Sequence, residues 1–256
     1  GNKFESLKEV NNFSEISNQY NALICDIWGV IHNGQELFPG INECLLNFKK
    51  LNNVVILLSN APRPSSYVSS VLDKFGFKDE CYDGIITSGD LTKKSLNEKI
   101  FGENCYHIGP ERDLNIFEGT NVNRVDFNNS DFIFVTGLFN DEIEDENDYL
   151  DLLNSARERE MTLVCANPDL LVQRGDKLIP CAGLISKTYE EMGGKVVNIG
   201  KPFSPIFKEA IEMVKKNSRF DEHKILVVGD GLETDIKGAN SIGLDSILVL
   251  GGLFSN

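Results

Sequence analysis

The sequence predicts an α/β protein with a Rossmann-like, parallel β-sheet, and two observations lead to this fold class. Short apolar runs rich in Val, Ile and Leu alternate along the chain with helical stretches. Most of these runs are continuously apolar, which is typical of strands covered by helices on both faces. Right-handed crossovers then connect the parallel strands. The 256 residues allow one large domain, or a core with a smaller second domain.

Each element is predicted from its own stretch of sequence, in chain order. The first half gives a strand in NALICDI (21–27), a helix in INECLLNFKKL (41–51), a strand in NVVILLSN (53–60), and helices in SSYVSSVLDKFGF (65–77) and LTKKSLNEKIFG (91–102). The second half gives strands in DFIFVTG (131–137), MTLVCANP (161–168), KVVNIGKP (195–202), KILVVGDG (224–231) and DSILVLGG (245–252), with helices in DYLDLLNSARERE (148–160) and SPIFKEAIEMVKKN (204–217). The acidic stretch 140–148 is expected to be a solvated loop or a helix start.

The charge balance excludes several classes of partner. Lys and Arg total 25 against 39 Asp and Glu, so the net charge is −14. Phosphates of DNA, RNA or anionic lipid would repel such a chain, so we expect no nucleic-acid or membrane partner. A small phosphorylated ligand is not excluded, because it meets only the local potential. No apolar run approaches the ~18 residues of a membrane helix, and residues 1–10 show no apolar signal segment.

The cysteines indicate a reducing compartment. None is paired at the CxxC spacing of a zinc or redox site, so buried, reduced thiols and a cytoplasmic protein are expected. The six are Cys25, Cys44, Cys81, Cys105, Cys165 and Cys181.

Polar residues terminate four of the predicted strands. These are Asp26, Ser59 with Asn60, Lys201, and Asp230. Because the carboxyl ends of parallel strands share one edge of a sheet, these side chains are expected to meet there. Each alone is explained by helix capping or by a surface position. Together they are chemically complete for phosphoryl transfer.

In that chemistry Asp26 would attack phosphorus and carry an aspartyl-phosphate. Asp230 and Asp26 would hold Mg²⁺, a hard ion that prefers oxygen ligands. Ser59 would grip the phosphoryl oxygens, and Lys201 would neutralise their charge. In GDGLETD (229–235), Asp235 would support the metal site, pair with Lys201, or cap the helix that follows.

Four stretches carry a resemblance to a known family. CDIWGVIHNG (25–34), LLSNAPRP (57–64), NIGKPFSPIF (198–207) and VVGDGLETDIKGA (227–239) follow the order found in the haloacid dehalogenase superfamily. FPGI (38–41) and IITSGD (85–90) resemble its phosphatases with a type-IIA cap, the 4-nitrophenylphosphatase and sugar-phosphatase group.

The resemblance assigns roles to single residues. It implies that Asp26 is the nucleophile, Ser59 the phosphate-binding hydroxyl, Lys201 the charge-balancing lysine and Asp230 the metal-binding acid, with Mg²⁺ as the cofactor. It also implies a backbone carbonyl ligand from Trp28.

The spacing predicts an inserted domain. The stretch between Ser59 and Lys201 leaves roughly 90–95 residues beyond one βα unit and a further helix, enough for a small domain. We expect a hydrolase core over 1–100 and 196–256, and a cap over 101–195 that closes on the site and selects the substrate. The resemblance also makes a homodimer a possible assembly, since caps of this group often take part in dimers. The chain stops soon after ILVLGG, whereas its relatives generally continue, so further C-terminal structure is expected.

Trp28 departs from the resembling phosphatases, whose first motif usually reads Asp-x-Asp. The second Asp protonates the leaving oxygen and then activates water, and an indole does neither. Losing general acid–base help typically costs ~10²–10⁴-fold in rate. Asp-x-Trp-Gly-Val is a recurrent variant of the resembling group, so the change is compatible with the family. The alternative is a purely structural role, in which the ring of Trp28 fills the interface between cap and core.

Three other residues are candidates near the site. His32 is nominated to replace the missing acid or base, although a lone His after a strand is usually structural. Asn60 either orients the nucleophile or shapes its turn. Arg63, in a loop stiffened by Pro62 and Pro64, either contacts the substrate or forms an ion pair.

The leading hypothesis is a Mg²⁺-dependent phosphatase of small phosphorylated metabolites that forms phospho-Asp26 and is slow because of Trp28. The alternative is a weak or silent protein that binds a phosphorylated ligand or regulates through it. A receiver-like protein fits less well because of the long insertion before Lys201, and dehalogenase chemistry is a remote further option.

Overall fold

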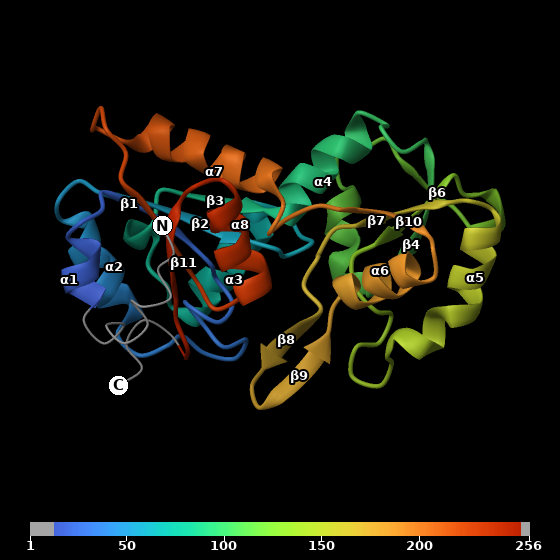
Figure 1. Cartoon of the computed structure of the whole chain (residues 1–256). Helices are drawn as coiled ribbons and strands as arrows, with labels where there is room; N and C mark the ends of the chain where they lie inside the picture. The colour runs from blue at the N-terminus through green and yellow to red at the C-terminus, as the bar shows by residue number, and fades with distance from the viewer. Residues whose placement is uncertain (1–12, 252–256) are drawn as a thin grey trace.

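The computed structural model describes residues 13–251, which form two α/β units side by side (Figure 1). The first unit, here called the core, has a five-stranded sheet in the order β12-β11-β1-β2-β3. Every neighbouring pair in it is parallel. Its strands are β1 (Ala22–Cys25), β2 (Val54–Ser59), β3 (Gly84–Thr87), β11 (Ile225–Gly229) and β12 (Asp245–Leu248).

Helices cover both faces of the core sheet. The short helix α1 (Phe13–Ser17) precedes β1. Helices α2 (Ile41–Lys49) and α3 (Ser65–Phe75) pack on one face, and α7 (Ser204–Asn217) and α8 (Lys237–Ser241) pack on the other. Strand β1 is apolar throughout because Leu23 and Cys25 lie in the first layer while Ala22 and Ile24 lie in the second.

The second unit, here called the second domain, has its own parallel sheet in the order β10-β7-β6-β4-β5. Its strands are β4 (Asn104–Ile108), β5 (Asn123–Arg124), β6 (Phe132–Val135), β7 (Thr162–Cys165) and β10 (Lys195–Asn198). Helices α5 (Leu150–Glu158) and α6 (Ala182–Glu191) cover one face, and α4 (Ser88–Asn97) with the 3₁₀ segment η3 (Glu111–Phe117) covers the other. The predicted α/β class with parallel sheets is therefore confirmed.

A β-hairpin leaves the second domain after β7 and reaches the core (Figure 1). It consists of β8 (Leu171–Arg174) and β9 (Lys177–Pro180), paired antiparallel. At its tip the N–H of Gly175 donates to the carbonyl oxygen of Asn33, in the loop after β1, at 3.3 Å. The hairpin thus links the second domain to the segment that follows Asp26.

The structure moves one predicted boundary. Strand β10 pairs with β7 over its whole length, Lys195–Asn198, so the second sheet runs past the boundary expected at residue 195. The stretch 195–202 was expected to be one core strand, but the strand ends at Asn198. Lys201 therefore lies in the connection from β10 to α7 and not at the tip of a core strand.

Two further expectations concern composition. All six cysteines are unpaired and buried, which agrees with reduced thiols. Among residues 13–251, no helix has both the length and the hydropathy needed to cross a membrane. Residues 1–10, considered above for a signal segment, lie outside the described part of the chain.

Candidate active site

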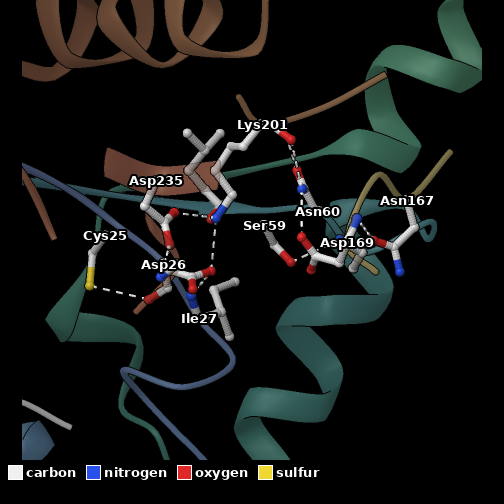
Figure 2. Close-up of polar contacts among 12 residues, drawn as sticks. Cys25, Asp26, Ile27, Ser59, Asn60, Asn167, Asp169, Lys201 and Asp235 are labelled. Carbon is white, nitrogen blue, oxygen red and sulfur yellow. Dashed lines mark hydrogen bonds and ion pairs between the residues drawn. The ribbon is translucent and has the colours of Figure 1, made fainter. Parts of the chain in front are cut away.

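Asp26 lies at the carboxyl end of β1, where the chain leaves the core sheet (Figure 2). Its backbone N–H still donates to Val228 on β11 at 2.8 Å, so the sheet fixes the position of its Cα. Its Oδ1 accepts the N–H of Ile27 at 2.8 Å, which orients the carboxylate. The side chain is buried. Asp26 is thus an oriented carboxylate at the sheet edge where α/β proteins bind ligands.

Lys201 bridges the carboxylates of Asp26 and Asp235 (Figure 2). Its Nζ donates to Asp26 Oδ1 at 2.9 Å and to Asp235 Oδ1 at 2.6 Å. A third bond runs to the carbonyl oxygen of Leu58 at 3.1 Å. An ammonium has three N–H donors, so all of them are used. Of the roles considered for Asp235, the structure shows the pair with Lys201, and its Oδ2 also accepts the N–H of Gly231, directly before the following helical segment, at 3.2 Å.

A third carboxylate completes the cluster. Oxygens of Asp26, Asp230 and Asp235 lie within 4.8 Å of one another. The Asp230 carboxylate lies so close to Gly29 that a Cβ there would meet its Oδ2 at 1.9 Å, and the φ of Gly29 is +98°. Only glycine fits such a position. The cluster has three carboxylates and one ammonium, and the atoms that could bind a metal are all carboxylate oxygens. The residues therefore fit a hard divalent cation.

The pKa values follow from this crowding. Burial raises the pKa of Asp26 to about 7; the ammonium of Lys201 opposes the shift and Asp230 adds to it. Burial, with the charge of Asp26, also raises the pKa of Asp235 to about 7. Burial alone would lower the pKa of Lys201, but the carboxylates of Asp235 and Asp26 outweigh it and raise this pKa. The lysine stays charged, whereas the carboxylates need a further cation to stay ionised together.

Ser59 and Asn60 occupy the end of the neighbouring strand β2. Ser59 is buried, and its Oγ accepts the N–H of Ala61 at 3.0 Å. Asn60 holds the backbone of Lys201 from both sides, accepting its N–H at 2.7 Å and donating to its carbonyl oxygen at 3.1 Å. A Cβ at Gly200 would approach Asn60 Oδ1 to 2.5 Å, which explains the glycine. Asn60 thus positions the segment that carries the lysine.

The second domain contributes a carboxylate that sequence reasoning missed. Asp169, in the loop after β7, accepts the Asn60 amide at 2.9 Å through Oδ1 (Figure 2). Burial raises the pKa of Asp169, and the charge of Lys201 opposes this shift. The available signal was its place directly after a predicted strand, the same signal that singled out Asp26.

Arg63 also contacts the second domain. Its Nε donates to Asp113 Oδ1 in η3 at 3.1 Å, and its guanidinium lies 4.5 Å from the centroid of the Tyr67 ring. Of the two roles considered for Arg63, the structure shows the ion pair. Asp113 was not anticipated from the sequence.

Trp28 directs its indole toward the second domain. The Nε1–H donates to the carbonyl oxygen of Gln173 in β8. Two residues after Asp26, the chain therefore carries a contact between the domains and no titratable group.

His32 lies behind this indole. Its ring centroid is 5.3 Å from that of Trp28 and 4.8 Å from that of Phe75. Its Nδ1 accepts the N–H of Gly34 at 2.8 Å. Burial lowers the pKa of His32 to about 4, so the ring is neutral at pH 7. This environment is that of a packed ring, and a role of His32 in proton transfer stays a prediction.

One cavity of about 890 Å³ lies between the two units. The residues described above that line it from the side of the core are Asp26, Trp28, His32, Ser59, Asn60, Arg63, Lys201 and Asp230. The second domain lines it with Asp169 and with charged residues not anticipated from the sequence, namely Arg112, Asp113, Asp141 and Arg174. The cavity is large enough for a small organic ligand.

The sequence and the fold are similar to those of known proteins. Residues 23–123 match the model of the haloacid dehalogenase-like hydrolases, and residues 198–256 match the HAD-hydrolase-like model. A crystal structure of a haloacid dehalogenase-like hydrolase from Brucella suis is 36% identical with a TM-score of 0.88, covering 94% of this chain and 89% of that chain. A possible sugar phosphatase of the HAD superfamily from Cytophaga hutchinsonii is 25% identical with a TM-score of 0.79, covering 94% and 88%.

A curated relative agrees with these structures. The ribonucleotide monophosphatase NagD of Escherichia coli strain K12 is 25% identical over 237 residues, which cover 91% of this chain and 88% of the relative. The expected family is thereby confirmed, while the place of the Asp-x-Trp motif within it stays a prediction. On its motifs, its fold and these relatives, the chain belongs to the haloacid dehalogenase-like hydrolases.

Proposed function

We propose that this hydrolase is a Mg²⁺-dependent phosphatase of small phosphomonoesters that forms a phospho-aspartate on Asp26. One observation carries the proposal: three carboxylates and one ammonium meet at the floor of a cavity, with Asp26 held by Lys201 at 2.9 Å. The relatives named as a ribonucleotide monophosphatase and a possible sugar phosphatase support the reaction class.

Asp26 and Asp230 would hold the cation, with the carbonyl oxygen of Trp28 as a further predicted ligand. When bound, Mg²⁺ supplies charge that offsets the repulsion between the nucleophilic carboxylate and the phosphate. Lys201 pairs with two of the three carboxylates, Asp26 and Asp235, and the cluster as a whole keeps the surplus of negative charge that this role requires.

The reaction then follows from the orientation of the protein groups. Asp26 attacks phosphorus while its Oδ1 remains oriented by Ile27 and Lys201. The bond from phosphorus to the ester oxygen breaks, and the leaving oxygen takes its proton from water, since Trp28 supplies none. Water then attacks the phosphorus of the acyl phosphate, which releases inorganic phosphate and restores the carboxylate. The ammonium of Lys201 balances charge on the phosphoryl oxygens, and the Ser59 hydroxyl is the proposed donor to them. Asn60 keeps Lys201 in place from the backbone side.

The second domain would act as the cap. It closes the cavity over Asp26 through Trp28, Arg63 and Asn60, which contact Gln173, Asp113 and Asp169. A closed cavity excludes water and strengthens the interactions of the phosphate with the charged groups. We further propose a cytoplasmic location, in line with six unpaired buried thiols. A measurement of molar mass in solution distinguishes a monomer from a homodimer.

One observation favours a second candidate function. Trp28 stands where resembling phosphatases carry their general acid, and its indole N–H is engaged by Gln173. A protein that binds a phosphorylated ligand with little or no turnover would keep the cation site and lose this acid. Ligand-dependent thermal stabilisation without phosphate release would favour this function.

Hydrolysis of 4-nitrophenyl phosphate tests the proposal. We expect Mg²⁺-dependent release of nitrophenolate that EDTA abolishes and that Asp26→Asn removes. Asp221→Asn, at an exposed acid outside the cavity, is the matched control and should keep the rate. Turnover that survives Asp26→Asn would overturn the proposed nucleophile, and no turnover of any phosphomonoester would leave the binding function.

A further inference from the structure

The two parallel sheets turn their carboxyl ends toward the same cavity. From the core, Asp26 follows β1 and Asp230 follows β11. From the second domain, Thr136 follows β6, Asn167 follows β7, and Arg112 lies in η3 after β4. Because parallel α/β sheets bind ligands at this edge, each sheet contributes a binding wall. Only the core wall is used by the chemistry proposed above.

The wall of the second domain carries an arginine pair that shares one carboxylate. Arg112 Nη2 donates to Asp141 Oδ2 at 2.6 Å. Arg174 donates to the same carboxylate with both Nη atoms, at 3.3 Å to Oδ1 and 3.2 Å to Oδ2. The Asp141 side chain is 9% exposed, whereas Arg112 is 44% and Arg174 30% exposed, so the guanidinium groups are the part open to solvent.

Within this wall, the cluster of Arg112, Arg174 and Asp141 has a local surplus of positive charge. Two guanidiniums meet one carboxylate, which leaves one unit of positive charge. Burial acts to raise the pKa of Asp141, but the two arginines outweigh it and lower this pKa. Asp141 therefore stays ionised and neutralises one of the two guanidinium groups. Arg63 differs, since it is matched one to one by Asp113 at 3.1 Å. The surplus stands out in a chain of net charge −14.

The hairpin fixes this charge relative to the catalytic floor. Arg174 ends β8, directly before the tip. On either side of Arg174, the carbonyl oxygen of Gln173 accepts the Trp28 indole N–H, and the N–H of Gly175 donates to Asn33 at 3.3 Å. The segment that follows Asp26 therefore holds the hairpin that carries Arg174.

We infer that Arg112 and Arg174 form a second anion subsite, so that the preferred ligands are phosphomonoesters with another carboxylate or phosphate remote from the reacting phosphate. The inference rests on the proposed function for the first site, where the reacting phosphate binds near Asp26. A guanidinium has five N–H donors in a planar fork, and the bonds to Asp141 use one of Arg112 and two of Arg174. The remaining N–H groups can donate to an oxyanion, and a carboxylate or a phosphate can accept two such bonds in parallel.

Calorimetric titration of matched ligand pairs tests the subsite without depending on turnover. The protein carries Asp26→Asn to prevent hydrolysis, and Mg²⁺ is present. The carboxylate arms are phosphoglycerate against glycerol phosphate and phosphogluconate against glucose phosphate. The phosphate arm is fructose bisphosphate against fructose monophosphate. In at least one arm we expect the anionic member to bind about tenfold tighter or better, as charge-assisted hydrogen bonds allow.

Variants then assign the preference to the arginines. Arg112→Gln and Arg174→Gln, each added singly so that Asp141 keeps one partner, should remove most of the difference within that pair. Arg157→Gln, at an exposed arginine on α5, is the matched control and should keep it. Circular dichroism melting confirms that each variant is folded.

Equal affinities within every pair would overturn the inference, as would undetectable binding of all six ligands or an equal loss in Arg157→Gln. Hydrolysis by the unmodified protein is measured separately. Turnover without any anion preference would refute the subsite alone. An anion preference without turnover would refute the phosphatase and support the subsite.

Discussion

Asn60 of the core donates its side-chain amide to the Asp169 carboxylate of the second domain at 2.9 Å. The same amide nitrogen reaches the carbonyl oxygen of Lys201, whose N–H returns to Asn60 Oδ1. One side chain therefore holds the lysine of the catalytic floor and the loop of the second domain together. Closure of the cavity and placement of the ammonium are physically linked.

This linkage predicts coupled stabilities. Asn60→Ala leaves the buried N–H of Lys201 without its partner, which costs about 1–3 kcal/mol of unfolding free energy. Asp169→Ala should cost less on its own, since it removes one hydrogen bond to a neutral amide. In a double-mutant cycle measured by urea unfolding, we expect a coupling of roughly 0.5 kcal/mol or more. Strictly additive effects would show that the contact carries no energy.

A second prediction concerns Lys201, which two buried carboxylates share. Lys201→Met leaves Asp26 and Asp235 without their counter-charge, and breaking a buried pair in this way costs about 3–5 kcal/mol. Activity should be lost as well.

Mg²⁺ distinguishes an electrostatic cause from a packing defect in this variant. Because the cation replaces part of the missing positive charge, it should raise the melting temperature of Lys201→Met more than that of the unmodified protein. Equal shifts in both proteins would contradict the charge argument.

The pH dependence of metal binding is a third prediction. Without the cation, burial raises the pKa of Asp26 to about 7. A proton must then leave this carboxyl whenever the cation binds below that pH. Proton and metal compete, so the apparent dissociation constant of Mg²⁺ should rise by up to about tenfold per pH unit below pH 7 and level off above it.

Calorimetry in two buffers of different ionisation enthalpy measures the released proton directly. Near pH 6 the observed heat should depend on the buffer, and near pH 9 this dependence should fade. A dissociation constant that stays flat from pH 6 to pH 9 would exclude the elevated carboxyl pKa.

The core half of this site is predictable from the sequence because its signals are local. Asp26 and Ser59 end adjacent parallel strands, and such ends share one edge of a sheet whatever the loops do. Lys201 also lies at this site, but it does not end a strand of the core sheet. It follows β10 of the second sheet, whose carboxyl edge faces the same cavity.

Strand β4, the hairpin and the contacts of the second domain were not predicted from the sequence, for physical reasons. Strand β4 carries Tyr106 and His107 between its apolar residues, and the hairpin of β8 and β9 is short and largely solvent-exposed. Neither has the continuous apolar pattern that revealed the core strands. Contacts such as Asn60 with Asp169 join residues far apart in sequence, and no local periodicity encodes them.

The fourth prediction separates the two effects of Trp28 on the reaction. The indole holds the hairpin through Gln173, and it leaves no general acid two residues after Asp26. Trp28→Phe removes the hydrogen bond and keeps an aromatic ring, whereas Trp28→Asp removes the bond and adds a carboxyl group. Without an acid, alkoxide leaving groups suffer far more than nitrophenolate, so the aryl-over-alkyl ratio of kcat/KM should be large in the unmodified protein. Trp28→Asp should shrink this ratio by about tenfold or more, since general acid catalysis is worth ~10²–10⁴-fold.

Trp28→Phe is the matched control, because it loses the same contact to the hairpin but gains no proton donor. Its ratio should stay near that of the unmodified protein even where its absolute rate falls. Steady-state rates on 4-nitrophenyl phosphate and glycerol phosphate give the ratio for all three proteins. If Trp28→Phe shrinks the ratio as much as Trp28→Asp does, the indole acts through the hairpin. The absence of an acid at this position would then not limit the reaction.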